Sequence, residues 1–149
     1  TDILGGGASS RLFQSLVKEK QLFSNIDCYH FGSSDNGLIT IEGKLVKNIT
    51  MKDAEAAVDA ELLRLKTDGI SEFELEKVKN KAESAMAFED MSLMNRASSL
   101  AMYELLGDAN LINTELDKYR QVTAMDIRNE AESIFHPDNS NTLYYLSAN

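Results

Sequence analysis

The sequence predicts an α+β domain in which helices pack on one face of an antiparallel sheet. Segments 24–32 and 37–46 are rich in β-favouring residues, and segment 142–147 near the end of the chain has the same character. The long stretch between residues 50 and 135 has helical periodicity instead. Because strands cluster early and late with helices between them, the order of elements disfavours an alternating parallel fold.

The composition is that of one globular domain. At 149 residues, with 43% hydrophobic and 26% charged residues, the chain is long enough to bury one substantial core. A net charge of -9 without a cluster of Lys or Arg argues against nucleic acid as a partner. The apolar runs are too short to cross a bilayer, so we expect no membrane partner. The single cysteine, Cys28, excludes an internal disulfide and is expected to be a small buried side chain.

The first elements in chain order are a short helix and a hairpin. Segment 10–18 has helical spacing, with its apolar positions at Leu12, Phe13 and Leu16. The two early strand segments are joined by a loop of turn residues, 33–37, which predicts an antiparallel pair. The second strand alternates apolar and polar residues, a pattern typical of a sheet that is covered on one side only.

The starts of the later helices are marked by a hydroxyl residue followed three positions later by a carboxylate. This capping-box spacing occurs at Thr50/Asp53, Ser71/Glu74, Thr114/Asp117 and Thr123/Asp126. The predicted helices cover 50–68, a segment beginning at 71, and 91–106, 110–121 and 123–135. The stripe at helical spacing in the first of them consists of Ala54, Ala57, Val58, Glu61, Leu62 and Leu65. Four methionines at helical spacing are expected in the core rather than in a binding groove: Met86, Met91, Met94 and Met102.

A glycine run ahead of the first helix is the candidate binding site. Glycine adopts positive φ without cost, serine can cap the following helix, and the N-terminus of a helix favours a carboxylate, a carbonyl oxygen or a phosphate. The residues concerned are Gly5, Gly6, Gly7, Ser9, Ser10 and Arg11. The run does not fit a P-loop, which needs Gly and Lys where Ser10 and Arg11 stand, and it has only two of the three glycines of a dinucleotide fingerprint. The alternative is a tight strand-to-helix turn that binds no ligand.

The glycine run and the residues after it, up to Lys20, resemble the start of the non-catalytic type of domain in the M16 family of zinc peptidases. This family includes pitrilysin, insulin-degrading enzyme and mitochondrial processing peptidase. Two later helix starts, 70–80 and 122–127, are similar to further family segments and occur in the family's order. The resemblance implies a single M16-type C-terminal domain over 1–149, truncated at its N-terminus, so that its sheet is incomplete. We expect a homodimer contact through the exposed sheet edge.

The resemblance also implies a function. M16 proteins pair a half that binds zinc with a half that closes the chamber and helps to hold the peptide, and the glycine-rich loop of the second half contacts substrate. The expected partners are therefore an M16 catalytic domain, in the same or a separate chain, and a peptide substrate. Some members add an Arg and a Tyr on and after a strand like 37–46, but this strand has no Arg and the residues after it have no Tyr.

The chain by itself is not expected to be a catalyst. The family's zinc motif, H-x-x-E-H, is absent, and the two histidines, His30 and His136, are far apart in the sequence and are interpreted as structural or surface residues. We expect no metal or other cofactor in this chain and zinc in the catalytic domain. Two alternatives stay open: a non-enzymatic assembly subunit resembling the core proteins of a respiratory complex, and a free-standing anion-binding module built on the turn 5–10.

Overall fold

The computed structural model describes residues 1–32 and 36–146, and it divides into two compact units. One unit consists of Thr1–Gly69 with Arg128–Asn149, and the other of Ile70–Ile127. In chain order the elements are α1 (Asp2–Gly5), η1 (Phe13–Glu19), β1 (Phe23–Phe31), β2 (Leu38–Leu45), α2 (Met51–Asp68), α3 (Glu72–Glu89), α4 (Leu93–Leu105), η2 (Ala109–Asn113), α5 (Glu115–Gln121), α6 (Ala124–Ile134) and η3 (Pro137–Asn139).

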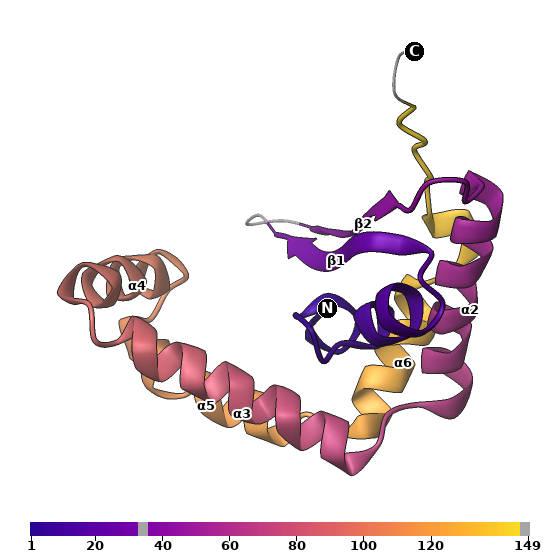
Figure 1. Cartoon of the computed structure of the whole chain (residues 1–149). Helices are drawn as coiled ribbons and strands as arrows, with labels where there is room; N and C mark the ends of the chain where they lie inside the picture. Colours follow the sequence, from indigo (N-terminus) through magenta and orange to yellow (C-terminus); the bar gives the residue numbers. More distant parts are fainter. Residues whose placement is uncertain (33–35, 147–149) are drawn as a thin grey trace. The chain divides into compact units, whose positions relative to one another are not determined.

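The predicted hairpin is confirmed. Strands β1 and β2 pair antiparallel, with Cys28 opposite Ile41 and an irregularity in the register after Phe23. Ile26 and Cys28 are buried, whereas Asp27 between them is exposed. In Figure 1 the N-terminal helices lie along one side of the hairpin. One face of the hairpin is therefore covered and the other is open. Residues 33–35 of the predicted loop lie outside the described part of the chain.

The helix expected over 10–18 is present, but much of it is not an α-helix. Helical geometry begins at Arg11 and becomes π-helical over η1, where the backbone N–H of Lys20 donates to the carbonyl oxygen of Ser15 at 2.9 Å. The helix ends because Gln21 adopts a φ of 53°, after which the N–H of Leu22 donates to the carbonyl of Leu16 at 2.9 Å. The sequence pattern did not distinguish the two helix types, because the four-residue spacing of Leu12 and Leu16 suits both.

Helix α2 is the long helix of the first unit. Thr50 caps it by accepting from the N–H of Asp53 at 3.1 Å, as predicted. Gly69 ends it at a φ of 67°, directly after the predicted last residue, 68. The Nζ of Lys66 in its last turn donates to the carbonyl of Phe135 at 2.8 Å. The buried apolar residues of this unit are Leu4, Leu12, Leu16, Phe23, Ile26, Cys28, Ala54, Leu65 and Ala131.

The second unit is a set of helices joined by polar contacts. Ser71 and Glu74 form a complete capping box at the start of α3. Helices α3 and α5 are linked by Arg120, which pairs with Glu83 and lies 3.6 Å from a carboxylate oxygen of Glu76. Lys79 adds a bond from its Nζ to the backbone carbonyl of Arg120 at 2.9 Å. A reciprocal box between Thr123 and Asp126 starts α6, as predicted.

Three expectations for the helical elements were wrong. Segment 110–121 is not one helix, because the short η2 and α5 are separated at Thr114, whose side chain makes no capping bond. The threonine hydroxyl donates instead to the carbonyl of Leu111 at 3.1 Å, which removes it from the cap. None of the four methionines expected in the core is buried. Helix α4 has no buried residue, so its Met94 and Met102 are exposed, as is Met91 just before it, and Met86 on α3 is half-buried.

The strand predicted over 142–147 does not form over 142–146, and residue 147 lies outside the described part. This segment has no strand partner among the described residues, and an extended sequence pattern is not sufficient for a strand without one. A side chain holds it instead, since the hydroxyl of Tyr144 donates to the carboxylate of Glu55 on α2 at 2.5 Å. This bond is the main reason why the pKa of Glu55 is lowered and the pKa of Tyr144 is raised.

Candidate functional site: the glycine-rich loop

The base of the glycine-rich loop is packed tightly against the first strand. Gly5 is the last residue of α1, and a Cβ built on it would lie 2.0 Å from the backbone nitrogen of Cys28. Only glycine allows two backbone segments to come this close. A Cβ on Gly6 would similarly lie 2.7 Å from the carbonyl oxygen of Asp2. The first two glycines are therefore required by packing within the unit.

The tip of the loop is built differently. Gly7 has a φ of 106°, a conformation that suits glycine, and a Cβ built on it would meet nothing within 4 Å. The turn is closed by bonds from the N–H of Gly7 to the carbonyl of Gly5 at 2.9 Å and from the N–H of Ser10 to the carbonyl of Gly7 at 3.0 Å. Gly7, Ala8 and Ser9 are exposed, so backbone is accessible at the tip. The loop thus combines a packed base with an open tip.

The residues that follow the tip hold the loop in place rather than reach outward. Ser10 is buried, with 2% of its surface exposed, and its hydroxyl has no hydrogen-bond partner among the described residues, so the expected capping bond from this side chain is absent. Arg11 does not point to the loop tip, because its guanidinium donates to the carbonyl of Gly69 at 2.8 Å. The carbonyl of Ala8 accepts from the side chain of Gln14 at 2.5 Å. The structure thus brings the six predicted site residues together, and two of them, Gly7 and Ser9, are exposed.

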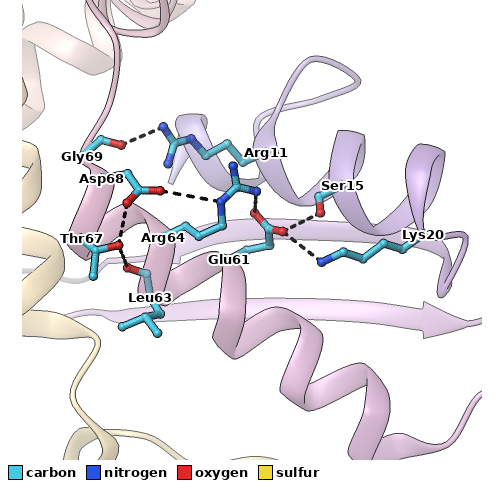
Figure 2. Close-up of polar contacts among 9 residues, drawn as sticks. All are labelled: Arg11, Ser15, Lys20, Glu61, Leu63, Arg64, Thr67, Asp68 and Gly69. Atoms are coloured by element: carbon cyan, nitrogen blue, oxygen red, sulfur yellow. Dashed lines mark hydrogen bonds and ion pairs between the residues drawn. The ribbon is translucent and has the colours of Figure 1, made fainter.

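A buried carboxylate secures the helix that follows the loop (Figure 2). Glu61 on α2 is 2% exposed, and its Oε1 accepts from the hydroxyl of Ser15 at 2.6 Å and from the Nζ of Lys20 at 3.2 Å. Its Oε2 accepts from Arg64 at 3.3 Å. Burial raises the pKa of Glu61, but the bonds from Ser15 and Lys20 and the charges of Lys20 and Arg64 outweigh it and hold the pKa below its ordinary value. The carboxylate therefore stays ionised at neutral pH.

Sequence reasoning placed Glu61 on the apolar stripe of its helix but gave it no role. The signal was present, because a charged residue on the buried face of an amphipathic helix requires a partner. Its partners could not be found from the sequence, since Ser15 and Lys20 lie 46 and 41 positions away. The folded arrangement of α2 and η1 brings the three side chains together.

An open hollow adjoins the base of the loop and the hairpin. It is lined by Gly5, Asn25, Asp27, Cys28, Tyr29, Glu42, Gly43 and Lys44. The hydroxyl of Tyr29 donates to the carboxylate of Glu42 at 3.2 Å, which fixes two of the polar side chains in this hollow. Burial, with the bond to Glu42, raises the pKa of the tyrosine. Cys28 is 5% exposed, which confirms the prediction of a small buried side chain. Burial raises the pKa of its thiol.

The described residues of this chain do not fit a zinc site. Among residues 1–32 and 36–146, no three His, Cys, Asp or Glu side chains come together in a group that could hold a metal ion. His30 lies at the end of β1, where its ring packs beside Gly37, and the Nδ1 of His136 accepts from the N–H of Asp138 at 3.3 Å. We also find no helix in the described ranges that combines the length and apolar character needed to cross a membrane.

Comparison with known proteins identifies relatives of the chain. A family model described as the "Peptidase M16 inactive domain" matches residues 1–82, which is more than half of the chain. The "Uncharacterized zinc protease YmxG" of Bacillus subtilis (strain 168) is 28% identical over 149 residues, which cover 99% of this chain and 36% of that protein. The chain therefore spans about a third of the length of this curated relative.

Solved structures have the same fold. A "putative zinc protease from Bordetella pertussis Tohama I" superposes with a TM-score of 0.84 at 24% identity, over 99% of this chain and 81% of that one. The "Inactive Peptidase Domain of a Putative Zinc Protease" from Bordetella parapertussis gives a TM-score of 0.80 at 24% identity, over 92% and 73%. A protease from Helicobacter pylori gives 0.78 at 24% identity, over 89% of this chain and 32% of that one. The predicted fold class is thereby confirmed.

Proposed function

Because this chain belongs to the M16 peptidase family and matches its inactive domain, we propose that it forms the non-catalytic wall of a peptide-binding chamber. In this proposal a catalytic domain of the same family, in the same or a separate chain, binds zinc and cleaves the peptide. The chain contributes contacts to the peptide and no catalytic group. The absence of H-x-x-E-H from its sequence is consistent with this division of roles.

The observation that carries the proposal is the construction of the glycine-rich loop. Its base is packed on β1 through Gly5, while backbone is exposed from Gly7 to Ser9. An extended peptide presents backbone carbonyl and N–H groups, and exposed backbone on a fixed loop can bind such groups without a large ordering cost. The open hollow beside Gly5 and the exposed face of the hairpin extend the surface that a peptide could contact.

The test is a peptide-binding titration with a variant at the loop tip. Labelled fragments of casein, an unfolded protein, serve as the probe, and fluorescence anisotropy measures their binding. We expect Gly7→Val to weaken binding, because its side chain would project from the exposed tip and because a φ of 106° is strained for a β-branched residue. The far-UV circular dichroism of the chain should be retained, since a Cβ at this position meets no protein atom within 4 Å. Lys118→Ala, on α5 in the other unit, is the matched control and should bind as the parent does. Equal binding by all three proteins would contradict the proposal.

The catalytic part of the proposal is tested on the whole protein from which the chain comes. We expect stoichiometric zinc and peptide hydrolysis there, both abolished by a chelator. A whole protein without zinc and without hydrolysis would favour the non-enzymatic assembly subunit instead. Stabilisation of the chain by inorganic phosphate, lost in Gly7→Val, would favour the anion-binding module.

A further inference from the structure

The helix that leaves the glycine-rich loop has an unusual register. Over η1 the backbone bonds in the π pattern, in which the N–H of residue i+5 donates to the carbonyl of residue i, and Lys20 and Ser15 are such a pair at 2.9 Å. A π-helical segment accommodates more residues per turn than an α-helix and is rare in proteins. Something outside the segment must therefore favour this register over the α-helical one.

The carboxylate of Glu61 contacts both ends of that same π turn. Its Oε1 accepts from the hydroxyl of Ser15 at 2.6 Å and from the Nζ of Lys20 at 3.2 Å, as Figure 2 shows. In an α-helix, residues five apart are about 140° apart around the axis, so the two side chains would point in different directions. In the π register they lie about one turn apart on the same side. The observed register therefore brings both donors to one buried oxygen.

We propose that Glu61 is a positioning residue that selects the π register of η1 and thereby fixes the position of the glycine-rich loop. If the segment changed to an α-helix, residues on the N-terminal side of the change would rotate by about 100° and shift by about 1.5 Å relative to those on the other side. The loop lies on that side. The buried Oε1 therefore controls where the exposed tip stands.

Helix α2 and its C-cap hold the two ends of the segment together. N-terminal to η1, the guanidinium of Arg11 donates to the carbonyl of Gly69 at 2.8 Å. Within η1 and directly after it, Ser15 and Lys20 donate to the carboxylate of Glu61. Arg64 contacts the second oxygen of the same carboxylate from within α2, one turn along. Since Arg64 does not contact η1 in any of these bonds, it supports the carboxylate without defining the register. This difference supplies a control.

The register is tested by NMR, through the scalar coupling between an amide nitrogen and the carbonyl carbon to which it is hydrogen-bonded. In the parent chain, Lys20 should couple to the carbonyl of Ser15. In Glu61→Leu we expect this coupling to be lost and replaced by one to Leu16, the α-helical partner. Arg64→Ala, the matched control, should keep the coupling to Ser15. Retention of that coupling in a folded Glu61→Leu variant would overturn the inference.

A second variant decides the matter if Glu61→Leu does not fold. Lys20→Met changes a side chain that is 44% exposed, so the fold should tolerate it, and it removes one of the two donors that define the π turn. We expect residue 20 to show a weakened coupling to Ser15 and a new coupling to Leu16. An unchanged coupling to Ser15 in this variant would overturn the inference.

The effect on peptide binding rests on the proposed function, whereas the register does not. With casein fragments as the probe, Lys20→Met and Glu61→Leu should bind more weakly than Arg64→Ala. If the register changes and binding does not, the role of the loop in binding fails while the positioning role of Glu61 stands. If the register does not change, the positioning role fails whatever the titration shows.

Discussion

Replacing Glu61 should destabilise the first unit in two distinguishable steps. Glu61→Gln keeps the shape and an acceptor oxygen but removes the charge, and Glu61→Leu removes the acceptor as well. The Glu61 side chain is 3% exposed, while the side chains of Lys20 and Arg64 are 44% and 64% exposed and can regain water. The cost of the first step is therefore small, because ion pairs with exposed partners contribute about 0–1 kcal/mol each.

A neutral amide oxygen also accepts a weaker hydrogen bond from the buried Ser15 hydroxyl than a carboxylate does. Together with the lost ion pairs, this lowers the free energy of unfolding by about 1–2 kcal/mol for Glu61→Gln. Glu61→Leu also leaves that hydroxyl without its acceptor, which costs a further ~1–3 kcal/mol. For a chain of this length, each kcal/mol lowers Tm by about 2–4 °C. Urea denaturation at pH 7 should therefore rank the parent above Glu61→Gln and Glu61→Gln above Glu61→Leu. The control Glu132→Gln, at an exposed pair with Arg128, should lie within about 0.5 kcal/mol of the parent.

The pH dependence of the stability of the same variants tests whether the charge of the Glu61 carboxylate causes the difference. The pKa of Glu61 is lower in the folded chain than its ordinary value of 4.5, since bonds from Ser15 and Lys20 and the nearby cations outweigh the effect of burial. The contribution of the Glu61 carboxylate to the free energy of unfolding is therefore complete above the pKa that Glu61 has in the unfolded chain. It is lost as the pH falls through the pKa that Glu61 has in the folded chain. The stability gap between the parent and Glu61→Gln should be constant from pH 7 to pH 5 and should shrink at more acidic pH. A parent no more stable than Glu61→Gln at pH 7, or a gap that persists into strong acid, would refute the reasoning.

Three further predictions concern the loop, the helix end and metal binding. Gly5→Ala should destabilise the chain by about 3 kcal/mol or more, because its Cβ would lie 2.0 Å from the backbone nitrogen of Cys28. Gly7→Ala should cost only about 1–2 kcal/mol, for its positive φ alone, and equal losses in urea denaturation would contradict this. Gln21→Gly should raise stability by about 1 kcal/mol, since Gln21 has a φ of 53°, and a lower denaturation midpoint would be the contrary result. The chain alone should neither bind zinc stoichiometrically nor cleave peptides, and calorimetry that finds a tight zinc site would disprove it.

The sequence was sufficient where local chemistry determines the structure. The hairpin followed from two β-rich segments around a loop of turn residues, and the capping boxes at Ser71 and Thr123 formed as their spacing indicates. Local patterns failed where a competing bond forms or a partner strand is lacking. Thr114 has the same spacing as a capping residue but bonds to a preceding carbonyl, and segment 142–147 has a strand-like pattern without a strand partner among the described residues.

The candidate site shows the same limit in more detail. Three consecutive glycines predicted a sharp turn, but their separate causes were visible only in the fold: Gly5 meets Cys28, Gly6 meets Asp2, and Gly7 adopts positive φ. The π register of η1 could not be predicted either, because apolar residues four apart fit both helix types. The one clue was Glu61, a charge on an apolar stripe, and it indicates a buried partner without naming it.

These contacts explain why a loop made largely of small residues can hold one conformation. Glycine has the largest backbone freedom in the unfolded chain, so ordering three in succession carries a large entropic cost. The structure offsets this cost at the ends of the loop, where Gly5 packs on β1 and the following helix is fixed to α2 through Arg11 and Glu61. The exposed tip around Gly7 is therefore held by its own turn bonds and by these two anchored ends. A tip ordered in this way remains free to contact a peptide, and the ordering cost has already been met before binding.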